Sequence, residues 1–490
     1  MMVMSLVFFI LQWQQHVSYR INVYLNTEEH SLEAIENLTY YNNSPHSLDT
    51  LYIHLYANAF RHDNTTFAQE MRKLGYNYTE SEEVGLGYIE INNITCEGET
   101  LDFAVDETVM AVPLDRSLKA GDSTALKIEF YVKIPITFTR IGYTQDHYEI
   151  VQWYPKVCVF DEAGWHREPY HAIGEFYGEF GSFDVEMNVP GNYIVAATGE
   201  RIDKDDRKFL ESLIVNNKKL DRGVRKKIRF RAENVHDFAW VCDPNFKVKR
   251  YTVDDTDIYV FYLKTHENKW KNAGHYAVDA VTRYNQWYGT YPYKNLSIVE
   301  GYFRDGMEYP NLVIIGIGED PFTRLFELIV IHEIGHQWFY GVLGSNEIDE
   351  AWLDEGFTAY TEIRYLEDKY GKEHSLVKLP FVPSFSRRYY HKLLYYIVQT
   401  NGLEKPVLTP AHEYLDVSVA YMNSAYSKPA LFLFNLEGIL GKETFNRILK
   451  RYFQEFKFTH PTSEDFMNIC EEESGQDVRF FFSQFLHKTD

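Results

Sequence analysis

Ile331-His332-Glu333-Ile334-Gly335-His336 places two histidines four residues apart. On an α-helix, residues at this spacing share one face, so both imidazoles can bind a single metal ion. Glu333 lies slightly off that face and can reach a water molecule on the metal. Eighteen residues separate His336 from Glu355, enough to end one helix and bring a second alongside. Two nitrogens and one carboxylate oxygen would hold zinc and leave a fourth position open, which is typical of a catalytic site.

The residues around this hexapeptide are apolar on almost every side of the expected helix. Phe326, Leu328 and Ile329 precede it, and Trp338 and Phe339 follow it. We therefore expect a helix that is buried nearly all round. Burying two histidines and a glutamate without partners costs free energy, which a bound metal ion would offset. The alternative, an amphipathic helix with surface histidines, does not fit these apolar flanks.

Length and composition indicate a globular protein of two or more domains. The chain has 490 residues, of which 45% are apolar and 24% charged. Its formal net charge of -22 argues against nucleic acid as a partner, because nucleic-acid binding needs a basic surface. One basic run covers residues 218–231, and Ile228 and Phe230 alternate with its last charges. This run is predicted to form an exposed hairpin with a half-buried strand.

The cysteines do not form a metal-binding pattern. They lie far apart and include no C-x-x-C pair, so they are not predicted to bind zinc; they are Cys96, Cys158, Cys242 and Cys470. Their disulfide state is left open, and all four could be free.

The N-terminus carries an apolar run of signal-peptide length. Residues 2–11 are apolar except for Ser5 and are too few to span a bilayer. We interpret residues 1–12 as a signal-peptide remnant, which favours export to the periplasm or outside the cell over a cytoplasmic location. A first buried strand is the alternative, because no Lys or Arg precedes the run. No other stretch is long and apolar enough for a transmembrane helix.

The first half of the chain has the two-residue alternation of β-strands. Apolar residues alternate with polar ones in three places, at Tyr19, Ile21, Val23 and Leu25, at Leu51, Ile53 and Leu55, and at Phe183, Val185, Met187 and Val189. Turn-forming residues such as Asn42-Asn43-Ser44-Pro45 separate the runs. Many short strands without intervening helices predict a β-sandwich or saddle-shaped sheet domain over residues 13–242.

The second half reads mainly as helices. A strand over residues 296–300 leads into Gly306-Met307-Glu308, and helical patterns cover residues 270–287, the region of the two histidines, and residues 429–440, 444–458 and 463–473. Ser427-Lys428-Pro429 predicts a helix start, with Ser427 as N-cap and the proline in the first turn. The predicted fold class is α+β, with a mainly helical domain over residues 243–490 that holds the metal site.

Several motifs in fixed order resemble a known family. His332-Glu333-x-x-His336, followed after eighteen residues by Glu355 in Trp-Leu-Asp-Glu-Gly-Phe, looks like the gluzincin aminopeptidases related to aminopeptidase N and leukotriene hydrolase. Gly306-Met307-Glu308 is similar to that family's Gly-x-Met-Glu-Asn motif. Ala425-Tyr426-Ser427-Lys428 is similar to its Tyr-x-Lys-Gly segment. Trp153-Tyr154-Pro155 is a weaker match, to the family's Phe-Pro-x-Phe-Asp-Glu.

The resemblance implies a fold and a role for each matched residue. The helical domain would be thermolysin-like and would hold one zinc ion per chain, bound by His332, His336 and Glu355. Glu333 would be the general base, and Tyr426 would donate a hydrogen bond to the tetrahedral oxyanion. The substrates would be peptides with a free N-terminus, bound by Gly306, Met307 and Glu308, with Glu308 holding the α-ammonium group.

The sequence departs from the family pattern at several positions. Tyr309 and Pro310 replace the motif's Asn, Pro429 replaces Gly after Lys428, and Asp354 stands where Asn is more frequent. The family also uses a second ammonium-binding side chain from the sheet domain, for which Asp146, Glu149 and Gln152 are candidates. Tyr421 is a second candidate for the oxyanion donor. The oligomeric state and the preferred N-terminal residue are left open, and a further domain or chain could complete the site.

Three functions are compatible with these residues. The leading hypothesis is a zinc aminopeptidase, for which Glu308 is the deciding residue because a carboxylate beside the metal attracts an ammonium group. The second is a zinc endopeptidase with an open cleft, which would cleave capped peptides internally. The third is a catalytically silent homologue that acts as a binding module. The intact set of His332, Glu333, His336 and Glu355 argues against the third hypothesis, because a silent protein need not keep a costly buried cluster.

Overall fold

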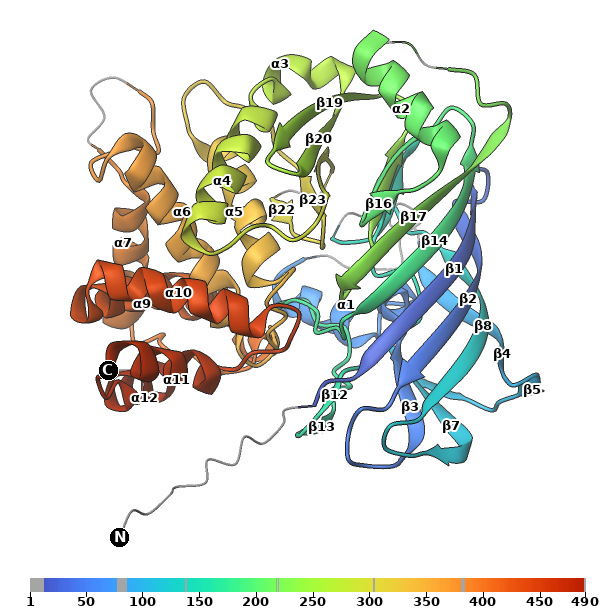
Figure 1. The fold of residues 1–490 in the computed structure, drawn as a ribbon, viewed down its shortest axis with the longest axis horizontal. Coiled ribbons are helices and arrows are strands. Elements are labelled where there is room, and N and C mark those ends of the chain that lie inside the picture. Colours follow the sequence, from blue (N-terminus) through green and yellow to red (C-terminus); the bar gives the residue numbers. More distant parts are fainter. Residues whose placement is uncertain are drawn as a thin grey trace.

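The structure is a computed structural model that describes residues 13–76, 86–136, 139–216, 218, 220–302, 305–379 and 384–488. Strands built from the first half form the right side of the molecule in Figure 1, and the helices of the second half form the left side. The predicted order, a β-sheet region followed by a mainly helical region, is confirmed. The segment interpreted as a signal-peptide remnant, residues 1–12, lies outside the described residues.

An eight-stranded, saddle-shaped sheet forms the outer wall of the β region (Figure 1). Its strands run in the order β16-β17-β14-β1-β2-β8-β4-β5, with β1 parallel to β14. The strands are β1 (His16–Asn26), β2 (Ser31–Tyr41), β4 (Tyr88–Cys96), β5 (Glu99–Thr100), β8 (Ser123–Lys133), β14 (Gly181–Pro190), β16 (Glu200–Arg201) and β17 (Arg225–Val235). Buried and exposed residues alternate along β1, β2 and β14, as the sequence pattern predicts.

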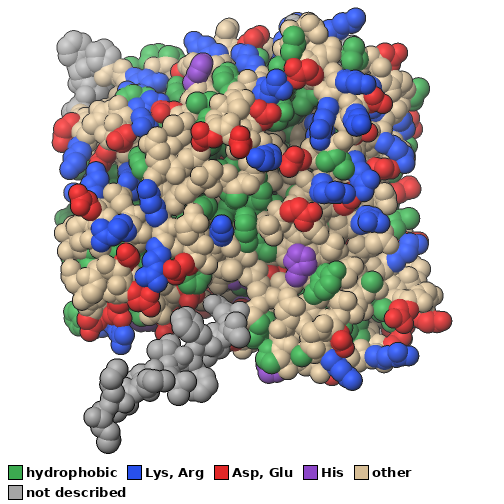
Figure 2. Space-filling view, in the orientation of Figure 1, with side chains coloured by type: hydrophobic (Ala, Val, Ile, Leu, Met, Phe, Trp, Pro, Cys, Tyr) green, Lys and Arg blue, Asp and Glu red, His purple; other side chains and the backbone are tan. Residues whose placement is uncertain are grey.

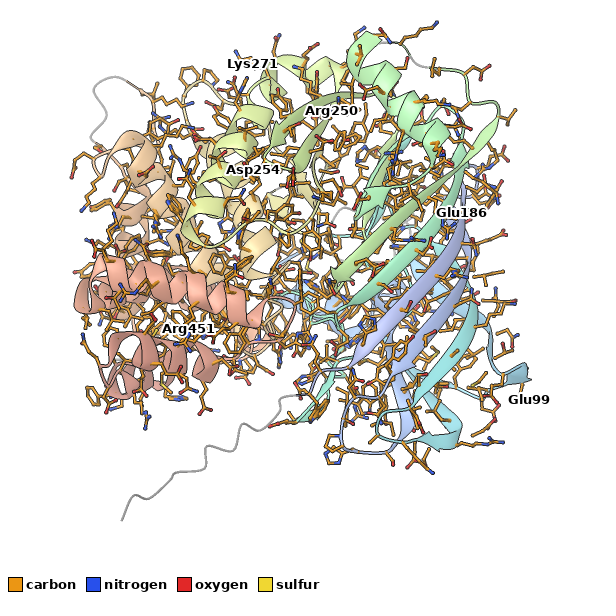
Figure 3. The ribbon with its side chains drawn as sticks, viewed as in Figure 1. Glu99, Glu186, Arg250, Asp254, Lys271 and Arg451 are labelled. Atoms are coloured by element: carbon orange, nitrogen blue, oxygen red, sulfur yellow. The ribbon has the colours of Figure 1, made fainter. Side chains whose placement is uncertain are left out.

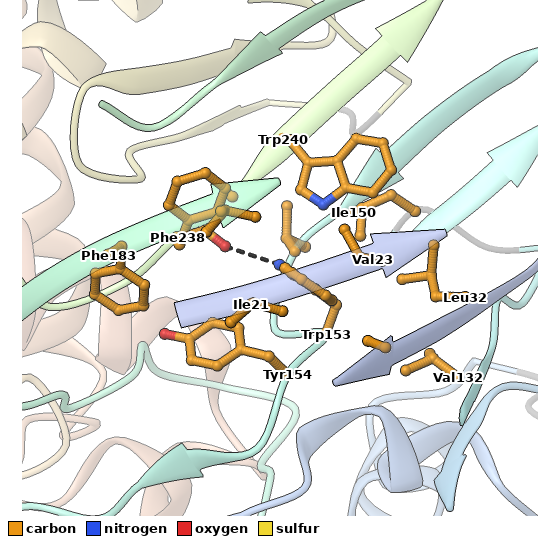
Figure 4. Packing of buried hydrophobic residues seen from close by; sticks show 14 of the residues in the cluster. Ile21, Val23, Leu32, Val132, Ile150, Trp153, Tyr154, Phe183, Phe238 and Trp240 are labelled. Carbon is orange, nitrogen blue, oxygen red and sulfur yellow. Dashed lines mark hydrogen bonds between the residues drawn. The ribbon is translucent and has the colours of Figure 1, made fainter. Parts of the chain in front are cut away.

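Two four-stranded sheets pack against the inner face of this wall. One has the order β15-β18-β10-β9 and the other β11-β3-β7-β6. Their strands are β3 (Leu48–His54), β6 (Ala104–Asp106), β7 (Val109–Leu118), β9 (Gly142–Thr144), β10 (His147–Ile150), β11 (Lys156–Val157), β15 (Ile194–Ala197) and β18 (Trp240–Asp243), and β12 (Phe160–Asp161) and β13 (Gly164–Trp165) form a separate hairpin. The core between the sheets holds Trp153 and Trp240, and the Trp153 indole donates to the Phe238 carbonyl at 3.0 Å (Figure 4).

Two helices interrupt the β region, where the sequence pattern predicts none. They are α1 (Thr66–Lys73) and α2 (Lys204–Asn216), which buries Phe209 and Leu210 on one face. The basic run is also less exposed than predicted, because Lys226 is buried and its Nζ lies 3.0 Å from an Asp206 carboxylate oxygen on α2. The burial of Lys226 depends on a carboxylate of α2 that the local alternation of β17 does not reveal.

The second half is built on a smaller, five-stranded sheet. Its order is β19-β20-β21-β23-β22, and the strands are β19 (Phe246–Val253), β20 (Thr256–Leu263), β21 (Asn295–Glu300), β22 (Gly306–Met307) and β23 (Leu312–Ile315). Met307 and Tyr309 are buried in the core of the β region, although they belong to the second half. Strand β22, which precedes the helix with the two histidines, is therefore packed between the two regions.

Helices cover this sheet and close the second half. They are α3 (Glu267–Trp270), α4 (Ala273–Trp287), α5 (Leu325–Phe339), α6 (Glu355–Tyr370), α7 (Arg387–Thr400), α8 (Ser418–Tyr421), α9 (Lys428–Leu440), α10 (Lys442–Phe456), α11 (Ser463–Ser474) and α12 (Arg479–His487). A π-helical turn, Met422–Ser427, joins α8 to α9 without a break. The predicted start of α9 is confirmed in position, because α9 begins at Lys428 directly after Ser427 and has Pro429 in its first turn; the Ser427 side chain, however, caps no backbone group, and the π-helical turn runs directly into α9.

The surface carries both signs of charge, and the four cysteines are free. Figure 2 shows Lys and Arg side chains among Asp and Glu over one face. On the outer face of the large sheet, Glu186 (Figure 3) pairs with Lys227 at 2.6 Å. Among the described residues, no helix has both the length and the apolar composition needed to cross a membrane.

One buried acid in the large sheet has no visible partner. Glu36 faces inward from β2, between Ile21 of β1 and Ile128 of β8. It is 0% exposed, and neither carboxylate oxygen has a hydrogen-bond partner among the described residues. Burial raises the pKa of Glu36 well above its usual value of 4.5. The folded protein therefore favours the neutral acid.

This acid predicts a pH-dependent stability. The unfolded chain releases the Glu36 proton near pH 4.5, whereas the folded protein retains it, so stability falls as pH rises above that value. We expect Glu36→Gln to gain stability over the wild type by about 1.4 kcal/mol for each pH unit above 4.5, until the folded pKa is reached. Guanidinium unfolding at pH 4 and pH 8 measures the difference. The exposed neighbour variant Glu33→Gln is the control, and an equal pH dependence of Glu36→Gln and wild type would contradict the assignment.

Candidate active site

Helix α5 (Leu325–Phe339) carries both histidines, and it is buried along most of its length as predicted. The Nε2 atoms of His332 and His336 lie 3.1 Å apart on one face. Each also lies 3.4 Å from the Glu355 Oε2 atom. The three side chains predicted to bind zinc therefore converge on one point, and their ligand atoms lie within 4.8 Å of one another.

Helix α6 (Glu355–Tyr370) brings the third side chain because it begins at Glu355 itself. A short 3-10 turn, Ala351–Leu353, ends the preceding segment and places Glu355 in the first turn of α6. Gly356 permits a close packing of α6 on α9, because a Cβ at this position would overlap the ring of Pro429. The eighteen residues between His336 and Glu355 thus bring Glu355 beside both histidines on a second helix, as the sequence predicts.

Carboxylates hold the other nitrogen of each imidazole. His332 Nδ1 lies 3.0 Å from Glu362 Oε2, and His336 Nδ1 lies 2.5 Å from Asp354 Oδ1. An ionised carboxylate only accepts hydrogen bonds, so each Nδ1 donates and each Nε2 keeps its lone pair for a metal. Glu362 lies seven residues after Glu355 on α6, so the two side chains lie on the same face of the helix. This spacing is visible in the sequence, but Glu362 was not among the predicted site residues.

The buried charges around the imidazoles favour a cation. Burial alone would lower the pKa of His332, but its interactions with Glu355 and Glu362 outweigh burial and raise this pKa to about 10. For His336, burial is likewise outweighed, by Asp354 and Glu355, and the pKa is raised well above its usual range. Burial opposes the ionisation of Glu355, yet the two histidines hold its pKa below the usual range. The site thus stabilises positive charge beside Glu355.

The residues present fit a catalytic zinc ion. Glu355 Oε2 is buried and has no hydrogen-bond partner among the described residues, although both imidazoles face it. Two imidazole nitrogens and one carboxylate oxygen are the donor set of catalytic zinc sites in proteins. Glu308 and Asp354 form a second acidic group with the same His336 and Glu355, within the same 4.8 Å limit. A divalent cation would compensate this concentration of buried charge.

Glu333 and the Gly-Met-Glu segment lie against each other. Glu333 is buried, and burial raises its pKa well above the usual range while His332 opposes the shift. A Cβ on Gly306 would overlap the Glu333 carboxylate, so any larger residue there would require this side chain to move. Gln337, one helical turn after Glu333, donates to the carbonyls of Glu308 and Tyr309 at 3.2 Å each. Helix α5 therefore fixes the position of the backbone that carries Glu308.

The acid beside Glu308 is one that sequence reasoning missed. Glu175, from the loop before β14, interacts electrostatically with Glu308, and Arg140 binds it through two contacts of 2.7 and 2.8 Å. Arg140 also contacts the Met307 sulfur. Burial raises the pKa of Glu175, and Arg140 opposes that shift. No local pattern marks Glu175 or Arg140, because tertiary packing alone brings them to the Gly-Met-Glu segment.

The three candidates for a second ammonium-binding residue have other partners. Asp146 accepts from the Tyr193 hydroxyl at 3.5 Å. Glu149 contacts His147 at 3.2 Å and accepts from the Tyr302 backbone, and the Gln152 amide donates to Asp237 at 2.7 Å. None of their hydrogen bonds reaches Glu308.

The hydroxyl of Tyr426 reaches the metal-binding cluster. Its oxygen donates to Glu355 Oε1 at 2.5 Å, and its ring stacks on that of His332 at a centroid distance of 6.2 Å. Burial and Glu355 raise the pKa of Tyr426 well above its usual range, so it remains a donor. The ring of Tyr421 lies 6.1 Å from that of Tyr426 and is only partly buried. Tyr426 is therefore the tyrosine in direct contact with an expected metal ligand.

Comparison with known proteins finds a family domain that is similar to the region holding this site. Residues 276–485 match the Peptidase family M1 domain. Leukotriene A-4 hydrolase of Xenopus laevis is 30% identical over 188 residues, which cover 38% of this chain and 28% of that protein. Aminopeptidase B of Rattus norvegicus is 28% identical over 171 residues, which cover 34% of this chain and 25% of that protein. The matched stretch spans less than a third of the length of either relative.

The likeness of the fold extends over nearly the whole chain. A solved structure of an M1 zinc metallopeptidase from Deinococcus radiodurans matches with a TM-score of 0.65 and covers 97% of this chain and 94% of its own, at 15% identity. A related match is described as a two domain M1 zinc metallopeptidase, in keeping with the two regions seen here. The ordered motifs, the matched domain and the shared fold agree: residues 276–485 match the peptidase M1 domain, and the fold of the chain is similar to that of an M1 zinc metallopeptidase.

Proposed function

We propose that this protein is a zinc aminopeptidase that binds one zinc ion per chain and hydrolyses the N-terminal bond of peptides with a free amino group. The observation that carries the proposal is the position of two further acids beside the metal donors. Glu308 lies in the same buried cluster as His336 and Glu355, and Glu175 of the β region interacts electrostatically with Glu308. Arg140 already pairs with Glu175, so Glu308 is the buried carboxylate whose charge a substrate ammonium group would balance.

Each residue then has one task in hydrolysis. Zinc, when bound by His332, His336 and Glu355, supplies a Lewis acid that acidifies water and polarises a carbonyl. Glu333 takes the proton of the attacking water and passes it to the leaving amine. The Tyr426 hydroxyl donates to the oxyanion that develops on the substrate carbonyl.

The two acids determine which peptides bind. An α-ammonium group between Glu308 and Glu175 would place the first peptide bond, and no later one, beside Glu333. One terminal guanidinium nitrogen of Arg140 donates to both carboxylate oxygens of Glu175, which holds this carboxylate in place. A peptide with a blocked N-terminus would present no positive charge to Glu308 and would bind poorly.

A paired-substrate assay tests the reaction. We expect the purified protein to hydrolyse aminoacyl anilides, to lose this activity to a chelator and to regain it with Zn²⁺. N-acetylated anilides should be poor substrates. Glu333→Gln should lower kcat by about 10² to 10⁴-fold, because it removes the proton acceptor, with zinc content unchanged. Equal cleavage of blocked and free substrates would rule out the exopeptidase assignment, and full activity of Glu333→Gln would refute its role.

Substitutions at the proposed ammonium-binding site should change KM. Glu308→Gln and Glu175→Gln each remove one charge facing the substrate ammonium, so KM for aminoacyl anilides should rise about tenfold or more. Arg140→Met should act in the same direction through Glu175. The exposed variant Glu162→Gln is the control for added amide groups. Unchanged KM values in both Glu308→Gln and Glu175→Gln would show that the ammonium group binds elsewhere.

The contact between Gly306 and Glu333 predicts an unusual sensitivity. Gly306→Ala places a methyl group where the Glu333 carboxylate lies, so the general base must move and kcat should fall by about tenfold or more. Gly438→Ala on α9 is the matched control, because nothing lies within 4 Å of its added Cβ. That control should keep full activity and gain up to about 1 kcal/mol of stability. Normal turnover by folded Gly306→Ala would contradict the observed packing.

A further inference from the structure

Helix α7 presents two donors, the buried His391 and the partly buried Arg387, to one carboxylate beside the candidate metal site. Arg387 and His391 are four residues apart on α7 and share the face toward α6. Arg387 Nε lies 2.5 Å from Glu362 Oε1, and His391 Nε2 lies 3.2 Å from the same oxygen. The other oxygen of Glu362 holds His332 Nδ1 at 3.0 Å. Glu362 is therefore fixed by α7 on one side and orients an expected zinc ligand on the other.

The second nitrogen of His391 reaches the segment that carries Tyr426. His391 Nδ1 lies 2.8 Å from Ser427 Oγ, and Ser427 directly follows Tyr426 in the π-helical turn. Ser427, His391 and Glu362 are each at most 1% exposed. Isolated π-turns are rare in helices and occur frequently at functional sites. The Ser427 side chain, which caps no helix, thus ties this turn to α7.

The protonation of His391 follows from its partners. Burial and the charge of Arg387 lower the pKa of His391 to about 4, so its ring is neutral at neutral pH. Glu362 can only accept, hence His391 Nε2 carries the proton and donates it. Nδ1 is then the acceptor for the Ser427 hydroxyl. The chain of donors runs in one direction, from Ser427 through His391 to Glu362.

We propose that His391 is a positioning residue that aligns two parts of the active site at once. Through Glu362 it holds the zinc ligand His332, and through Ser427 it holds the turn that presents Tyr426. The second effect rests on the proposed function, because it needs Tyr426 to act on the substrate. The first effect concerns metal retention and does not depend on any catalytic assignment.

Two substitutions separate these effects. In His391→Asn, the amide oxygen lies near the former Nδ1 and can still accept from Ser427, but the donor to Glu362 is lost. We expect zinc loss to a chelator to become about tenfold faster or more, because outer partners of metal-binding histidines contribute 10 to 100-fold in affinity. The kcat of the zinc-saturated variant should stay within about twofold of wild type.

His391→Gln reverses the pattern, because its amide nitrogen lies near the former Nε2 and can donate to Glu362. Zinc retention should stay within about twofold of wild type, whereas kcat should fall about tenfold at unchanged KM, since Tyr426 acts in the transition state. Ser427→Ala should reproduce this loss, and the double variant should lose no more than either single one. Lys392→Asn, on the exposed face of α7, is the control for helix propensity.

The outcomes distinguish this inference from the proposed function. Folded His391→Asn and His391→Gln proteins that both match wild type in zinc retention and kcat would overturn the positioning role. Equal loss of both properties in both variants would overturn the division into two separate effects. If either histidine variant fails to fold, Ser427→Ala and Glu362→Gln test the same two links singly, with the same criteria. A wild-type protein that retains zinc but hydrolyses no aminoacyl anilide would refute the proposed function alone.

Discussion

Two imidazole nitrogens and one carboxylate oxygen meet in the interior of the protein, and this convergence constrains everything around it. The Nε2 atoms of His332 and His336 both face Glu355 Oε2, which has no other hydrogen-bond partner among the described residues. Glu362 and Asp354 hold the opposite nitrogens and set their protonation. Such a cluster is stable in a protein interior when a cation occupies its centre, because each isolated buried charge is costly. Because the helices α5 and α6 are buried, the side chains of this cluster cannot rotate away from its centre.

The two regions of the chain contribute different parts of the site. The helical region supplies the metal donors, Glu333 and Tyr426, whereas the β region supplies Glu175 and Arg140 against the Gly-Met-Glu segment. Met307 and Tyr309 are packed into the core of the β region, which fixes the strand that carries Glu308. The contact between the regions therefore shapes the part of the site that would recognise the end of a peptide. The residues that would select the substrate and the residues that would carry out the reaction therefore belong to the two different regions, which are in contact at the site.

The metal-binding residues could be predicted from sequence because helical spacing alone brings them together. His332 and His336 share a face by periodicity, and eighteen residues are enough to return Glu355 to them. The β region was also predictable, since alternation along β1 and β14 is strict. Helix α2 was not predicted, because its charged residues follow a run of strands. Asp206 of this helix binds the buried Lys226 of the basic run.

The remaining site residues depend on contacts that no local pattern encodes. Glu175 and Glu308 are separated by more than a hundred positions and meet only in the folded protein. Ser427 precedes a lysine and a proline, which favours a helix start, and α9 does begin at Lys428. The Ser427 hydroxyl binds His391 instead of capping that helix, and no local pattern predicts this tertiary hydrogen bond. Sequence patterns thus predict where the metal lies better than they predict how the substrate is held.

The most direct test of the metal centre is a crystal of the purified protein, with diffraction recorded on both sides of the zinc absorption edge. We expect one anomalous peak per chain, about 2.0–2.2 Å from the Nε2 atoms of His332 and His336 and from an oxygen of Glu355. The absence of a peak at this point in zinc-supplemented crystals, or imidazoles that turn away from Glu355, would contradict the account.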